Sequence, residues 1–295
     1  MKTHKHQFLR RSCLAGLMLV VLTGFASHAQ VTVVSDDCTA VNTASGFALG
    51  QGINSGVYPP FSNRITGTVA ANLRYYKSGG ERANSKYLID DNRIRVSTET
   101  KIGRFVLSTD GSTPFNYARA LGTLGASPSD PAVYEVRISM QNEASSTARL
   151  SFGLSTSEGD ANNWDFGVQI NHADAAHDYY TVHRRIHSAS SGAGSLNNPI
   201  ATAPPGSWKT MVHFLIRVTD AGAESGANFN SRVQVSMDDG NTWVYDTSTD
   251  SALPNGFRFD APGRVFIWDQ ASNGSGTCYY DNFSVISIHA PPPPP

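Results

Sequence analysis

The sequence is poor in cysteine and in charge, and it has no basic excess. Charged residues make up 16% of its 295 residues, and 23 Lys and Arg stand against 24 Asp and Glu, for a formal net charge of -1. A chain that binds nucleic acid through bulk electrostatics needs a clear basic excess. The composition therefore excludes that class. The hydrophobic share of 40% and the aromatic share of 10% are sufficient for a folded core.

Long hydrophobic runs are also missing, and the longest lies near the start of the chain. Residues 1–29 combine a basic beginning, an apolar run at 14–22 and small residues at Ser27 and Ala29, where a signal peptidase reads. The run is too short for a comfortable membrane span. We expect a signal peptide that is cleaved before Gln30, and an exported protein that is periplasmic, extracellular or at the cell surface.

The chain has only three cysteines, and Cys13 lies within the predicted signal. Cys38 and Cys278 remain, one near each end of the mature chain. In an oxidising compartment they form a natural disulfide pair, which would place the first and last strands side by side. The alternative is two unpaired buried thiols.

Paired carboxylates are scarce in the predicted strands. Glycoside hydrolysis needs two carboxyl groups that flank the scissile bond. Glu99, Glu135 and Asp165 are isolated from one another along the sequence. We therefore do not expect a classical glycoside hydrolase.

Short segments of alternating polar and apolar residues recur between turn residues, and helical periodicity is almost absent. This pattern predicts an all-β protein, an antiparallel two-sheet β-sandwich. We expect one sandwich domain over residues 30–289, and any subdomain boundary would fall in the Ser- and Pro-rich loop at 127–131. The proline-rich residues 290–295 predict a stiff extended tail that acts as a linker or spacer.

The clearest alternation lies in residues 163–187 and predicts a β-hairpin, because successive side chains of a strand point to opposite faces. One face of its first strand is apolar and is expected to pack in the core: Trp164, Phe166, Val168 and Ile170. With a turn near Asp174, three cross-strand pairs are expected: Asp165 with Arg185, Gln169 with Thr181, and Gly167 with His183.

The polar face of this hairpin has the side chains that a hydroxyl-rich ligand requires. The expected ligand-binding residues are Asp165, Gln169, Tyr179, His183 and Arg185, joined by Trp208 as an exposed aromatic that follows a Pro-Pro-Gly loop. The alternative is a solvated face whose charges merely pair with one another.

Four stretches carry a resemblance to a known superfamily: residues 149–154, 164–170 and 232–243, and the closing Tyr-Asp-Asn-Phe sequence at 279–285. Together they resemble the concanavalin A-like lectin/glucanase superfamily, especially the laminin-G-like jelly rolls of secreted bacterial proteins. The resemblance covers mainly residues 132–289. It implies two curved sheets, a face that binds glycans and a structural calcium, for which Asp269, Asp281 and Asn282 are the candidate oxygen ligands. No organic cofactor is expected.

The superfamily contains binding modules and enzymes, so the fold does not choose between them. We expect a secreted, non-catalytic carbohydrate-binding or adhesion module that recognises a polysaccharide. The first alternative is a polysaccharide lyase acting on a uronate-containing glycan, with Tyr179 or His183 as base and Gln169 and Arg185 on the carboxylate. Alginate-lyase-like members of the superfamily carry Gln-Ile-His or Gln-Val-His where this chain has Gln169-Ile170-Asn171. The second alternative is a structural domain of a cell-surface protein.

Overall fold

A computed structural model describes most of the chain after the predicted signal. The described residues are 30–38, 73–77, 86–90, 92–98, 103–109, 113–143, 149–155, 164–172, 178–188, 191–203, 210–260, 264–271 and 276–288. The predicted signal peptide, the proline tail and Trp208 lie outside these ranges. Within them, no helix has the length and hydrophobicity that a membrane span requires.

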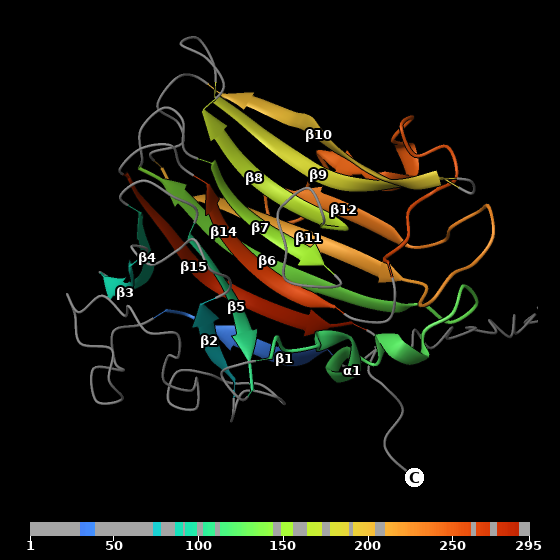
Figure 1. The fold of residues 1–295 in the computed structure, drawn as a ribbon, viewed down its shortest axis with the longest axis horizontal. Helices are drawn as coiled ribbons and strands as arrows, with labels where there is room; N and C mark the ends of the chain where they lie inside the picture. Colours follow the sequence, from blue (N-terminus) through green and yellow to red (C-terminus); the bar gives the residue numbers. More distant parts are fainter. Residues whose placement is uncertain are drawn as a thin grey trace, which may run out of the picture.

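Two antiparallel sheets face each other, so the predicted β-sandwich is confirmed (Figure 1). The eight-stranded sheet contains β1 (Val31–Asp36), β3 (Lys86–Asp90), β4 (Arg93–Thr98), β6 (Ala132–Asn142), β11 (Val212–Asp220), β12 (Arg232–Ser236), β13 (Tyr245–Asp246) and β15 (Gly276–Ser287). The seven-stranded sheet contains β2 (Arg74–Lys77), β5 (Gly103–Ser108), β7 (Arg149–Ser155), β8 (Phe166–His172), β9 (Asp178–Ser188), β10 (Ser191–Ala203) and β14 (Val265–Ala271). The described helices are α1 (Tyr117–Leu121) and two 3-10 turns, Thr123–Gly125 and Thr247–Thr249.

Each sheet joins runs of consecutive strands to strands from distant parts of the chain. The orders are β13-β12-β11-β6-β15-β4-β3, with β1 also paired to β15, and β10-β9-β8-β7-β14-β5-β2. Strands from before and after the 127–131 loop therefore share both sheets. Because most neighbours are brought together across long stretches of chain, their pairing depends on tertiary packing rather than on local turns.

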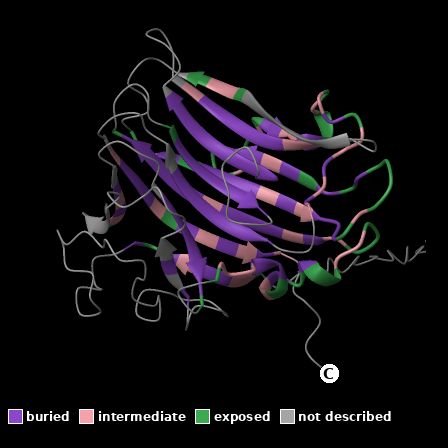
Figure 2. Ribbon diagram, in the orientation of Figure 1, coloured by how far each residue is buried: buried purple, intermediate pink, exposed green. Residues whose placement is uncertain are grey.

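The core lies between the sheets and is rich in aromatic rings. Phe105 and Trp268 stack with centroids 5.2 Å apart, and Tyr75 meets Trp268 edge-on at 5.5 Å. Phe283 of the opposite sheet contacts Trp268 at 4.9 Å. Figure 2 shows that the strands of both sheets are largely buried, while exposed residues concentrate in the connections. Such edge-to-face contacts stabilise a core beyond the area that they bury.

The first and last strands are neighbours, as predicted, but no disulfide joins Cys38 to Cys278. Strand β1 pairs with β15 so that Asp36 lies opposite Phe283, which leaves Cys38 out of register with Cys278. Both thiols are buried, and their Sγ atoms donate to different oxygens: Asp36 O at 3.7 Å for Cys38, and Asn142 Oδ1 at 3.3 Å for Cys278. The predicted disulfide is therefore corrected to two buried thiols.

Candidate functional site

The hairpin at the centre of the sequence forms with the predicted register. Gln169 lies opposite Thr181 and Gly167 opposite His183. One step further along, Arg185 N donates to Asp165 O at 2.9 Å. The polar face of the hairpin is therefore fixed by backbone pairing.

This polar face points away from the core. Val168, Ile170, Tyr180 and Val182 belong to the core cluster, and Tyr180 meets Phe214 of the other sheet. The alternate residues of β8 and β9, among them Gln169, therefore lie on the outer face of the seven-stranded sheet, the side opposite the core.

The pairing register aligns the outer-face residues of neighbouring strands in rows. The rows that run across the strands are Arg149–Asn171–Tyr179, Asp269–Ser151–Gln169–Thr181 and Gly153–Gly167–His183. Polar side chains fill the first two rows, while the glycines of the third leave a groove in the side-chain layer. The sequence reasoning did not select Arg149, because its neighbour Asn171 is reached only through the β7–β8 pairing.

Trp164 is buried, as predicted, but it lies in the glycine groove of the outer face and not between the two sheets. An added Cβ would lie 2.3 Å from the Trp164 ring at Gly153 and 2.7 Å from it at Gly167. Trp164 is fully buried in a cluster with Val106, Val265 and Ile267, separate from the core cluster. The strand alternation does not reach Trp164, because β8 begins only at Phe166.

Gln169 is the centre of a hydrogen-bond network on this face. Its Nε2 donates to Ser151 Oγ at 2.8 Å, and its Oε1 accepts from Asn171 Nδ2 at 2.8 Å and from His183 Nε2 at 2.9 Å. A carbonyl oxygen only accepts, so Nε2 of His183 carries the proton and Nδ1 keeps the lone pair. The network fixes both the orientation and the tautomer of His183.

His183 is neutral at physiological pH. Burial, together with the positive charges of Arg149 and Arg184, lowers the pKa of its imidazole to about 4. Burial disfavours the charged form of a histidine. The imidazole therefore acts as a neutral hydrogen-bonding group and not as a cation.

The row Arg149–Asn171–Tyr179 contains the more accessible groups of this face. Arg149 is exposed and Tyr179 is half-buried. Between them, Asn171 Oδ1 is buried and has no hydrogen-bond donor in the described structure. An unsatisfied buried acceptor costs free energy, which a donor from a ligand would recover.

Asp165 and Arg185 are engaged with the protein instead. Arg185 Nη1 lies 2.7 Å from Asp260 Oδ2 and 3.9 Å from Asp165 Oδ1, and the backbone N of Asp260 donates to Asp165 Oδ1 at 3.1 Å. Burial raises the pKa of Asp165 to about 7, against the lowering effects of that hydrogen bond and of the arginines. Both residues lie beside the network, but Arg185 pairs with the Asp260 carboxylate and Asp165 accepts from the Asp260 backbone.

The candidate calcium ligands are not brought together. Asp269 lies on the outer face of the seven-stranded sheet, where its Oδ2 pairs with Arg104 Nη2 at 3.0 Å. Asp281 and Asn282 lie in β15 of the other sheet, where Asn282 donates to Asp281 from both its backbone and its side chain. Among the described residues, no cluster of His, Cys, Asp and Glu has the arrangement of a metal site.

A pH prediction follows from the opposite shifts of Asp165 and His183. Folding lowers the pKa of His183 from 6.5 to about 4, so the free energy of unfolding decreases as the pH falls from 6.5 to 4. The pKa of Asp165 rises from 3.8 to about 7, so stability falls as the pH rises from about 4 to about 7. The two trends oppose each other between pH 4 and 6.5.

We expect Asp165→Asn to remove the second trend alone. Relative to the wild type, the free energy of unfolding of the variant should then rise between pH 4 and 7, by an amount on the order of 4 kcal/mol at most. Urea denaturation at intervals across this range measures the difference. A difference that stays constant with pH would contradict the buried, neutral carboxyl group.

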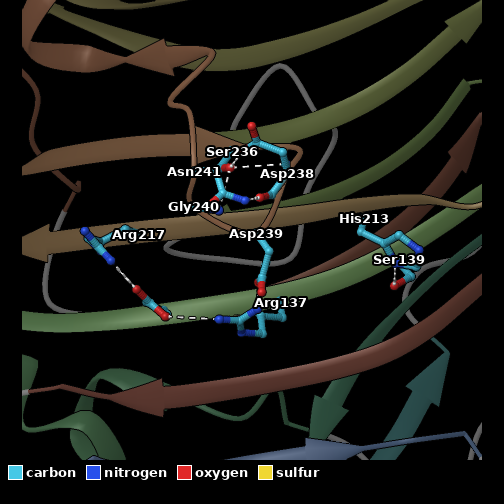
Figure 3. Close-up of polar contacts among 10 residues, drawn as sticks. Arg137, Ser139, His213, Arg217, Ser236, Asp238, Asp239, Gly240 and Asn241 are labelled. Carbon is cyan, nitrogen blue, oxygen red and sulfur yellow. Dashed lines mark hydrogen bonds and ion pairs between the residues drawn. The ribbon is translucent and has the colours of Figure 1, made fainter.

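A second candidate site lies on the outer face of the eight-stranded sheet and was missed by the sequence reasoning. Here a hollow of about 500 Å³ forms over β6 and β11. Figure 3 shows its polar contacts: Ser139 Oγ lies 2.7 Å from His213 Nδ1, and Arg137 forms an ion pair with Asp239. Ser139 and His213 meet only through the pairing of β6 with β11, so no local sequence pattern indicates them.

No model of a protein family matches the sequence, and no curated protein matches it. Solved structures that are similar include an alginate lyase from Pseudomonas aeruginosa, with 12% identity over 68% of this chain and 84% of the lyase and a TM-score of 0.40. The CBM2 module of the evolved Dit of Lactobacillus casei BL23 phage J-1 has 12% identity over 89% of this chain and 97% of its own, with a TM-score of 0.42. A sialidase has 10% identity over 79% of this chain, which spans 19% of the sialidase, with a TM-score of 0.39.

Because the TM-scores of these structures lie below 0.5, none of them carries an argument about activity or ligand.

Proposed function

We propose that the chain is an exported, non-catalytic carbohydrate-binding module that binds a polysaccharide on the outer face of the seven-stranded sheet. The observation that carries the proposal is the unsatisfied Asn171 Oδ1 between exposed Arg149 and half-buried Tyr179. A sugar hydroxyl supplies the donor that Asn171 lacks. Arg149 donates to ring or hydroxyl oxygens, and the Tyr179 ring offers an apolar face for sugar C–H groups.

The network around Gln169 supports this role by holding Asn171 in place. Asn171 Nδ2 donates to Gln169 Oε1 and also to Thr181 Oγ1 at 3.1 Å, so its Oδ1 is left as the remaining group. A pre-organised acceptor binds with a smaller entropy cost than a mobile one. Gln169, Thr181 and Ser151 are positioning residues in this view, because they are buried and already bonded to one another.

The test is a glycan array followed by calorimetry on the best soluble oligosaccharide. We expect Arg149→Ala and Tyr179→Ala each to weaken binding by about tenfold, which corresponds to about 1.4 kcal/mol. Arg232→Ala, on the opposite face of the sandwich, is the matched control and should bind as the wild type does. Unchanged affinity in both site variants, or recovery of protein partners alone, would overturn the proposal.

A lyase remains the second candidate because His183 is neutral, with its Nδ1 lone pair directed away from Gln169. In this reaction the base removes the proton beside the uronate carboxylate, the bond to the leaving oxygen breaks, and a carbon–carbon double bond forms. The carboxylate would then bind to Arg149, since Arg185 is paired with Asp260. Incubation with alginate or polygalacturonate, read at the absorbance of unsaturated products, separates the two functions: turnover that is lost in His183→Ala supports the lyase.

A further inference from the structure

The hollow on the eight-stranded sheet, called here the His213 hollow, is lined by five separate segments of the chain. These segments are residues 35–37, 137–139, 213–215 and 237–239, together with Asn282 and Ser284. Its volume of about 500 Å³ lies within the range of roughly 300–1,000 Å³ that small-molecule sites occupy. It lies across the core from the row of Arg149 and Tyr179, so one ligand molecule of that size does not reach both.

The turn at 237–239 is held in place by its own hydrogen bonds. Asp238 Oδ1 accepts from Ser236 Oγ at 2.7 Å, and Gly240 N donates to Ser236 Oγ at 2.8 Å (Figure 3). Asp238 Oδ1 also accepts from Thr242 N at 2.8 Å. Asp239, with φ of 60°, is then presented toward β6, where it pairs with Arg137. Hydrogen bonds within the turn therefore hold this side of the hollow.

The side chains of the hollow combine donors, acceptors and apolar surface. His213 is exposed and uses Nδ1 for Ser139 Oγ, which leaves its Nε2 for a ligand. The Arg137–Asp239 pair offers a donor beside an acceptor, the combination that neighbouring hydroxyls of a sugar require. Met237 and Leu215 add apolar surface that suits sugar C–H groups.

We propose that the His213 hollow is a second carbohydrate-binding site, on the outer face of the sandwich opposite the first. The inference goes beyond the proposed function, because it rests on other residues and stands if the first site fails. Two sites on opposite faces allow one chain to bridge two polysaccharide strands. Bridging raises the overall avidity without any new contact at either site.

The test is an NMR titration in which one histidine on each face reports binding at that face. Imidazole signals of His183 and His213 in labelled full-length protein are assigned with the variants His183→Asn and His213→Asn. The protein is then titrated with alginate, polygalacturonate, laminarin and galactomannan oligosaccharides. We expect one of these probes to shift the His213 signal, and Arg137→Ala to reduce the affinity read there by about fivefold to tenfold. Gln234→Ala, on β12 of the same face and outside the hollow, should leave the affinity unchanged.

The outcomes separate this inference from the proposed function. A shift at both histidines supports both sites, and a shift at His213 alone supports the hollow while contradicting the first site. A shift at His183 alone overturns the second site, and no shift at either overturns both. If a probe binds both faces, mixing the wild-type protein with the parent polysaccharide should produce turbidity through bridging. The Arg137→Ala variant should produce none. Turbidity that persists in this variant would contradict bridging through the hollow.

Discussion

Replacing Asp220 by Asn is expected to lower the free energy of unfolding by about 3–5 kcal/mol, because it removes the charge that balances a buried arginine. Arg264 Nε lies 3.2 Å from Asp220 Oδ2, and Arg264 Nη2 lies 3.4 Å from Asp220 Oδ1. The two side chains are 2% and 0% exposed. Solvent therefore does not replace the lost carboxylate.

The pair also connects the two sheets. Asp220 ends β11 of the eight-stranded sheet, and Arg264 directly precedes β14 of the seven-stranded sheet. Asparagine keeps the Oδ1 that accepts from Gly222 N at 2.8 Å, so the substitution removes mainly the charge. Urea denaturation at neutral pH measures the change. The control is Arg232→Ala, which breaks the exposed pair with Asp246 and should cost about 1 kcal/mol or less.

Two results would contradict this account. A loss below about 1 kcal/mol in Asp220→Asn would mean that the pair is solvated. The double variant Asp220→Leu with Arg264→Met removes both charges, and it should be clearly more stable than Asp220→Asn, because apolar replacement of a whole buried pair is often close to neutral. Equal losses in the two would show that packing and not charge dominates.

The hairpin was predictable because its determinants are local. Alternation over 163–187 and the length of the loop are enough to place Gln169 opposite Thr181, and the observed register agrees. Each side chain then faces inward or outward according to its position alone. The alternation predicted the wrong face for Trp164. This residue precedes β8, and its ring packs against Gly153 and Gly167 on the outer face.

The rest of the candidate sites depends on contacts between distant parts of the chain. No local pattern shows that Asp260 neutralises Arg185, or that Ser139 meets His213. The cysteine prediction illustrates the same limit. The positions of the two cysteines near the chain ends correctly predicted that β1 pairs with β15. The register that separates Cys38 from Cys278, however, is set by the whole sheet.

Trp164→Ala is the second large effect, with an expected loss of about 3–5 kcal/mol in the free energy of unfolding. The ring is fully buried, and it covers Gly153, Gly167 and the apolar residues Val106 and Ile267 on the outer face. Removing it opens a cavity over the glycine groove that rigid strand backbone does not refill. The matched control is Trp243→Ala: this ring is half-buried beneath the Arg217 guanidinium at 4.7 Å, and its loss should cost about 1 kcal/mol.

A double-mutant cycle tests whether position 153 requires glycine because the Trp164 ring lies against it. Gly153→Ala alone places a Cβ 2.3 Å from Trp164, so it should cost about 1–3 kcal/mol through overpacking. In the Trp164→Ala background the same methyl group enters empty space, and its cost should fall to near zero or change sign. Additive losses would instead show that Gly153 is required by the backbone of β7. Urea denaturation of the four proteins gives the coupling free energy between the two substitutions. This value decides whether Trp164 can lie against β7 only because Gly153 has no side chain.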